Sequence, residues 1–123
     1  MYESTYRAML EETSEQIREN ERMALDRSVA LLRQAQRAGR GTRESVEALL
    51  FVNRLWTLLL EDLSDSGNGL PDSLKASLIS IGIWILHRAE EIRQGKINDF
   101  SALIEVSESI RDGLGKQQHV HSS

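Results

Sequence analysis

The stretch VEALLFVNRLWTLLLEDL, residues 46–63, decides the fold of this chain because its apolar side chains cover most of a helix surface. With successive residues about 100° apart, only one consistently polar stripe remains, formed by Arg43, Glu47, Arg54 and Glu61. A helix that is apolar on most other sides must be surrounded by neighbours. In a short chain those neighbours can include a second protein, so the stretch favours binding over catalysis.

The composition narrows the class of protein further. The chain has 123 residues, one proline, no cysteine and a formal net charge of -4. This length suits one domain with its own core, and the missing cysteines remove disulfides and thiolate chemistry. The negative charge argues against a general nucleic-acid binder, since phosphate contacts need clustered positive charge. We find no readable secretory signal and no apolar run long enough to span a bilayer, so we expect a soluble cytoplasmic protein without membrane contact.

Start and stop signals predict four helices, over residues 13–38, 43–63, 71–94 and 100–112. Thr13 with Gln16 fits a capping box, Thr42 is the expected cap of the second helix, and glycines 39, 95 and 113 are the expected stops. Asn98 or Asp99 is expected to cap the fourth helix. Short connections favour antiparallel neighbours. The expected fold is therefore all-α, a compact antiparallel bundle of about four helices.

The two ends of the chain are expected to differ from the helical domain, which we place at residues 13–114. Residues 1–12 read as a short amphipathic arm, because Tyr2, Tyr6, Met9 and Leu10 recur at helical spacing. Residues 115–123 read as a disordered tail.

The run LISIGIWIL, residues 78–86, has a competing interpretation as a buried strand. Isoleucine favours strands, and Gly82 weakens a helix by about 1 kcal/mol relative to alanine. The segment bounded by Pro71 and Gly95 is too long for one strand, however, and its apolar residues align at helical spacing. We therefore expect a helix.

Both tryptophans are candidates for partner contact. Trp84 falls on the polar side of its predicted helix, so it either packs against a neighbouring helix or the arm, or anchors a partner. Trp56 fits core packing, but with Leu59 and Leu63 it could also receive an amphipathic helix. The tentative partner-binding set is Trp56, Leu59, Leu63 and Trp84.

Four arginines lie close together without an acid between Asp26 and Glu44: Arg33, Arg37, Arg40 and Arg43. One interpretation is a small RNA phosphate patch. The other is that the first two complement the C-terminal end of the helix dipole while the rest are solvated. Four charges without interleaved aromatic residues are weak support for RNA contact.

The motifs of catalysis and ligand binding are missing. His87 stands beside Arg88, and His119 and His121 form an isolated pair that would need further ligands to hold a metal. There is no GxxxxGK[ST], GxGxxG or HExxH motif. We expect neither an enzyme nor a cofactor.

The sequence resembles the flagellar biosynthesis regulator FlaF family over roughly residues 2–114. The segments that carry the resemblance are ERMALDRSVALL (21–32), EALLFVNRLWTLLLEDL (47–63), LPDSLKASLISIGIWILHRAEEIRQG (70–95) and DFSALIEVSESIRDGL (99–114). The resemblance implies a small cytoplasmic protein that promotes flagellin production and export, in opposition to or alongside the flagellin-messenger regulator FlbT. It supplies no catalytic or ligand residues.

Three functions remain open at this point. The first is a flagellin-binding export chaperone that holds an amphipathic terminal helix of flagellin. The second is a post-transcriptional regulator of flagellin mRNA, acting directly through the four arginines or through FlbT. The third is a homodimer whose extra apolar surface pairs with itself and whose role is indirect.

Overall fold

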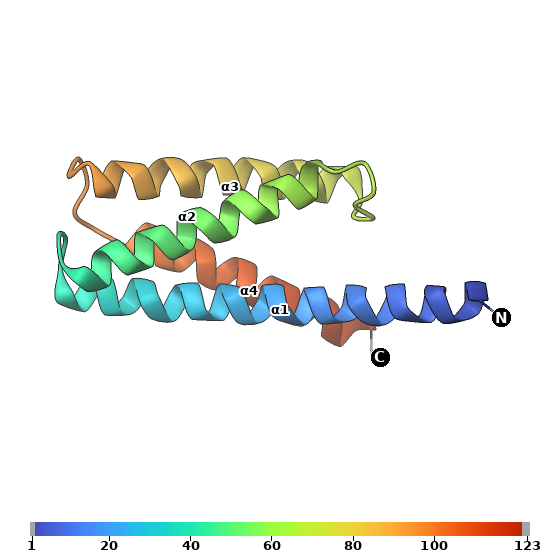
Figure 1. The fold of residues 1–123 in the computed structure, drawn as a ribbon. Helices are drawn as coiled ribbons and strands as arrows, with labels where there is room; N and C mark the ends of the chain where they lie inside the picture. Colours follow the sequence, from blue (N-terminus) through green and yellow to red (C-terminus); the bar gives the residue numbers. More distant parts are fainter. Residues whose placement is uncertain (1, 122–123) are drawn as a thin grey trace.

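The computed structural model describes the backbone of residues 2–121 and the side chains of residues 19–113. Its four helices are α1 (Tyr2–Ala38), α2 (Arg43–Ser64), α3 (Asp72–Arg93) and α4 (Ser101–His121). Successive helices run in opposite directions and form an antiparallel bundle (Figure 1). The predicted fold class is therefore confirmed.

The turns at one end of the bundle follow the predicted local signals. Gly39 ends α1 with a φ of 97°, and its N–H donates to the carbonyl of Ala35 over 2.8 Å. Thr42 caps α2, because its Oγ1 accepts the backbone N–H of Ser45 over 3.2 Å. Gly95 follows α3 with a φ of 81°, a conformation that glycine adopts without strain. These residues place the start of α2 beside the end of α3.

The loop before α4 also contains the predicted cap. Asp99 Oδ1 accepts the backbone N–H of Ser101 over 2.9 Å. Hydrogen bonds from the side chain and the backbone N–H of Ser101 lower the pKa of Asp99, because they favour its ionised form. The carboxylate therefore stays charged at the positive end of the helix dipole.

Two predicted helix ends were wrong. α1 begins at Tyr2 and not at Thr13, because residues 2–38 contain no glycine or proline that would interrupt the helix. α4 does not stop before Gly113 but continues to His121. A single glycine costs only about 1 kcal/mol in a helix and keeps its backbone N–H, so it does not by itself end one.

Several sequence predictions concern side chains outside the described set, which covers residues 19–113. They are the apolar pattern of the arm and the histidine pair near the C-terminus. The predicted capping role of Thr13 and Gln16 was wrong, because both residues lie inside α1. The domain division at residues 12 and 114 stays a prediction.

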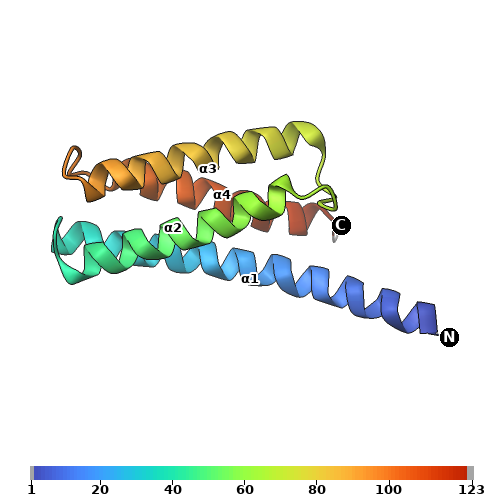
Figure 2. The ribbon, with the colours of Figure 1, turned by 45° about the horizontal axis from the view of Figure 1, so that its top comes forward.

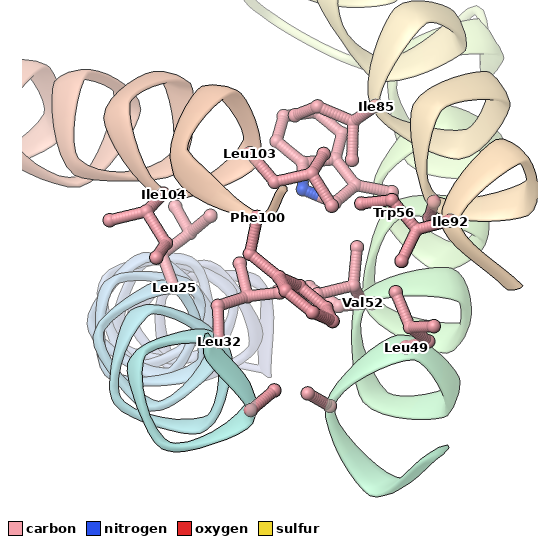
Figure 3. Packing of buried hydrophobic residues seen from close by; sticks show 14 residues of the cluster. Leu25, Leu32, Leu49, Val52, Trp56, Ile85, Ile92, Phe100, Leu103 and Ile104 are labelled. Carbon is pink, nitrogen blue, oxygen red and sulfur yellow. The ribbon is translucent and has the colours of Figure 1, made fainter. Parts of the chain in front are cut away.

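The hydrophobic core is built by all four helices (Figure 3). Trp56 and Phe100 are its largest fully buried side chains, and only 1% of each is exposed. Aliphatic side chains pack around them: Leu25, Leu32, Val52, Ile85, Ile92 and Leu103. Burying a side chain of this size contributes roughly 1.5–3 kcal/mol, so this cluster is the main source of stability.

Gly82 lets α2 and α3 approach each other closely. A Cβ at this position would lie 2.8 Å from Leu60 Cδ2 and 2.9 Å from Trp56 Cε3. The glycine that weakens the helix in the sequence thus provides the space for the indole ring of α2. Residues 72–93 form a helix, so the strand interpretation of residues 78–86 was wrong.

The helices do not pack equally against one another. α1 packs against both α2 and α4, and α2 packs against both α1 and α3, whereas α3 and α4 barely touch. α3 and α4 separate along their lengths (Figure 1), and α3 lies beside α2 in both views of the ribbon (Figures 1 and 2). α3 is therefore held to the bundle mainly by α2. Within the described part of the chain, we find no helix with the length and apolar character needed to cross a membrane.

Candidate functional site

The outer surface of α2 and α3 carries large apolar side chains. Leu50 is 66% exposed, Leu58 58% and Val46 53%, and all three are on α2. Ile83 on α3 is 58% exposed. The wide apolar arc of α2 therefore exceeds what α1 and α3 cover. Val46 and Leu50 are one turn apart on α2, and neighbouring apolar exposure of this kind is typical of an interaction surface.

A groove lies between the first half of α2 and the last half of α3. It has a volume of about 330 Å³. The lining residues are Arg40, Gly41, Ser45, Val46, Leu49, Leu50, Asn53, Ala89, Glu90, Ile92 and Arg93. Val46 and Leu50 are its exposed apolar side chains, whereas Leu49 and Ile92 are buried core residues. The groove is thus an apolar surface that opens outward from the core.

The charged residues of the groove are one ion pair and one further arginine. Arg93 Nε donates to Glu90 Oε2 over 2.8 Å. Hydrogen bonding from Arg93, with a weaker contribution from Gln94, lowers the pKa of Glu90 to about 2. Arg40 places its guanidinium against Gly95, where a Cβ would lie only 2.9 Å from Nη1. No hydrogen bond or ion pair joins Arg40 to any described side chain.

The predicted partner-binding residues do not form one open surface. Trp56 is 1% exposed and Leu63 is buried, while Leu59 and Trp84 are half-buried. Trp56 packs on Gly82 within the α2–α3 contact. A partner could reach Leu59 and Trp84 without rearrangement, whereas Trp56 and Leu63 support the helices that present them. The predicted contact role of all four stays a prediction.

Trp84 is paired with an arginine on the same helix. The guanidinium carbon of Arg88 lies 5.2 Å from the ring centroid, within the range of a cation–π interaction. Arg88 Nε is buried and has no hydrogen-bond partner. Trp56 Nε1 on α2 is likewise buried without a hydrogen-bond partner. The guanidinium group of Arg88 and the indole of Trp84 therefore cover each other on one flank of α3. This explains how a tryptophan can be placed on the polar side of the predicted helix.

The four clustered arginines do not act as a single free patch. Arg33 pairs with Glu108 of α4, and Arg43 Nε donates to Glu47 Oε1 over 3.0 Å. Arg37 and Arg40 make no ion pair with a described acid. Neutralising acids beside two of the four charges weaken the attraction for phosphate.

Metal-binding geometry is also missing from the side chains that the structure describes. No group of three or more histidine, aspartate or glutamate side chains among residues 19–113 is arranged to hold an ion. His87 Nε2 lies 3.9 Å from Glu91 Oε1, one turn along α3, and is well exposed.

The groove was not predicted from the sequence. Val46 and Leu50 are spaced one turn apart, a signal visible in the sequence, but Leu49 and Val52 have the same chemistry and lie in the core. Helical periodicity shows which residues share a side. It does not show which side of so broad an apolar arc remains uncovered, because that depends on where α1 and α3 pack.

The described chain is a small antiparallel helical bundle with an apolar groove on its α2–α3 side. A family model described as "Flagellar protein FlaF" matches residues 2–114, and the chain belongs to this family. The resemblance seen in the sequence is thereby confirmed, and membership implies a role in flagellar biosynthesis. No curated protein and no solved structure gives a significant match.

Proposed function

We propose that the chain binds flagellin through one of its amphipathic terminal helices and thereby promotes flagellin synthesis and export. The observation that supports this function is the exposure of Val46, Leu50 and Leu58 on the central helix of a flagellar family member. Large apolar side chains held on a rigid helix are suited to bind another amphipathic helix.

A regulator that binds flagellin needs an exposed apolar surface, and α2 provides one. A flagellin end that is unstructured before assembly folds when it docks, and its apolar face is then hidden from other flagellin molecules. The binding free energy comes from apolar side chains that the partner covers. The regulator therefore needs apolar groups that stay outside its own core, as Leu50 does at 66% exposure.

Size-exclusion chromatography of the purified chain with flagellin tests the proposal. We expect flagellin to co-elute with the chain, and a flagellin without its terminal helices to elute alone. Circular dichroism of the same sample establishes that the chain is folded. Separate elution of intact flagellin from the folded chain would contradict the proposal.

The two other functions have their own tests. Direct mRNA binding through the arginines requires RNA affinity that falls steeply with salt, since phosphate contacts release counterions. An mRNA role through FlbT requires a complex of the two proteins. A homodimer would appear in light scattering at micromolar concentration as twice the mass of the 13.9 kDa chain.

A further inference from the structure

We infer that the outer side of the α2–α3 pair, which we call the hairpin face, binds an amphipathic helix with an acidic residue placed to reach Arg40. The inference rests on the proposed function, since flagellin supplies the helix. It assigns the contact to a surface separate from Trp56, Leu59, Leu63 and Trp84. It also specifies the chemistry that the bound helix must have.

The apolar part of the hairpin face is longer than the groove itself. On α2, Val46, Leu50 and Asn53 line the groove at i, i+4 and i+7. On α3, Glu90 and Arg93 line it, and the same helical stripe continues through Leu86 to Ile83. Residues 83–93 span about 15 Å at 1.5 Å per residue. This length matches about three turns of a bound helix.

The hairpin face is open to a partner. Figure 1 shows α4 behind α2, and no other helix lies in front of α2 or above α3. Leu50 and Ile83 are among the most exposed large apolar side chains of the described residues. Asn53 is an exposed, uncharged polar side chain of the groove, and it can hydrogen-bond to a bound backbone or side chain.

Charge decides which amphipathic helix fits. Glu90 is already engaged by Arg93, so the pair presents little net charge to a partner. Arg40 lines the same groove and pairs with no described acid. Its guanidinium lies against Gly95, which leaves room for it at the end of the groove. A carboxylate on the bound helix would give Arg40 the bidentate partner that its geometry favours.

The test is a titration of flagellin into the folded full-length chain and its variants by isothermal calorimetry. Leu50→Asp should weaken binding at least tenfold, because it places a charge in the apolar contact. Met23→Asp is the matched control, since Met23 is a similarly exposed apolar side chain on α1, outside the groove, and it should bind as the wild type does. Circular dichroism melting should show both variants folded.

The acidic contact has its own pair of variants. Arg40→Glu should weaken flagellin binding about tenfold at low salt and flatten the dependence of affinity on salt. Arg54 is an exposed residue of α2 outside the groove. Arg54→Glu should therefore change neither the affinity for flagellin nor its dependence on salt. Wild-type affinity in Leu50→Asp or Arg40→Glu, or equal losses in the matched controls, would overturn the inference while flagellin binding itself stands.

Two further outcomes would also overturn it. If the wild-type chain binds no flagellin, the proposed function fails and the inference fails with it. If light scattering shows that the wild type is a dimer and Leu50→Asp a monomer, a second copy of the chain occupies the hairpin face.

Discussion

The α1–α4 edge and the α2–α3 edge of the bundle are built differently. Between α1 and α4, Arg33 pairs with Glu108, and Arg111 Nη1 lies 3.2 Å from Asp26 Oδ1. Between α2 and α3, no hydrogen bond or ion pair joins the described side chains, and the contact depends on Gly82. Among the described side chains, ion pairs within the chain therefore join the α1–α4 edge, which we call the polar edge. The apolar edge leaves Leu50 and its neighbours to be covered by something else.

The largest expected effect is at the apolar edge. Trp56→Ala should lower the free energy of unfolding by roughly 3–5 kcal/mol, because it removes a fully buried indole that packs on Gly82. Trp84→Ala is the matched comparison. It should cost less, since Trp84 is half-buried and its contact with Arg88 contributes only about 0.5–1 kcal/mol. Urea denaturation measures both, and equal losses would remove the distinction between the two indoles.

A smaller effect is expected where the two helices touch. Gly82→Val should destabilise the fold by about 1–3 kcal/mol, since its Cβ meets the Trp56 ring at 2.9 Å. Gly113→Ala serves as the control, because a Cβ there meets nothing within 4 Å. That control should stabilise α4 by up to about 1 kcal/mol. Thermal melts of the two variants should shift in opposite directions. A stabilising valine at 82 would mean that α2 and α3 are not in close contact.

The polar edge should contribute less than either apolar contact. A double-mutant cycle on Arg33→Ala and Glu108→Ala should give a coupling of about 0.2–1 kcal/mol, because the pair is solvent-exposed. The coupling should weaken in 1 M salt, where the Debye length is only about 3 Å. A coupling as large as the loss in Trp56→Ala would show that the ion pairs, and not the apolar core, hold the helices together.

The sequence predicted those parts of the structure that depend on neighbours along the chain. Gly39, Thr42 and Gly95 are local signals, and each acts as expected. Gly113 was misread because a glycine stop needs a left-handed backbone, which Gly113 does not adopt. Gly82 shows the limit of local reasoning. Gly82 is needed because a larger side chain would collide with the Trp56 ring, and that contact is between two different helices.

The sequence predicted that apolar surface would remain exposed, but it did not predict which residues would form that surface. The apolar arc of residues 46–63 indicated a surplus of apolar surface, and the exposure of Leu50 agrees with it. The tentative binding set included the tryptophan of that arc, Trp56, and its exposure of 1% supports the other interpretation, core packing. Which leucines remain outside depends on the crossing of α2 with α1 and α3. Helical periodicity contains no information about that crossing.

The smallest effect concerns the ion pair beside the groove. Hydrogen bonding from Arg93 lowers the pKa of Glu90 from 4.5 to about 2 in the folded chain. A depressed carboxylate pKa contributes stability above the unfolded pKa, and this contribution disappears as the pH falls through the folded value. Glu90→Gln removes it at every pH. The stability difference between the wild type and Glu90→Gln should therefore be greatest above pH 4.5 and vanish near pH 2.

Thermal melts of both chains between pH 6 and pH 2 measure this difference. Asp99, whose pKa is also lowered, is present in both chains and cancels from the comparison. Because Glu90 and Arg93 are exposed, salt should reduce the difference. If instead the difference grows on acidification, Glu90 does not bind Arg93 as an anion. The groove would then be lined by an Arg93 free of Glu90 as well as by Arg40, and the α2–α3 edge would attract an acidic partner through both arginines.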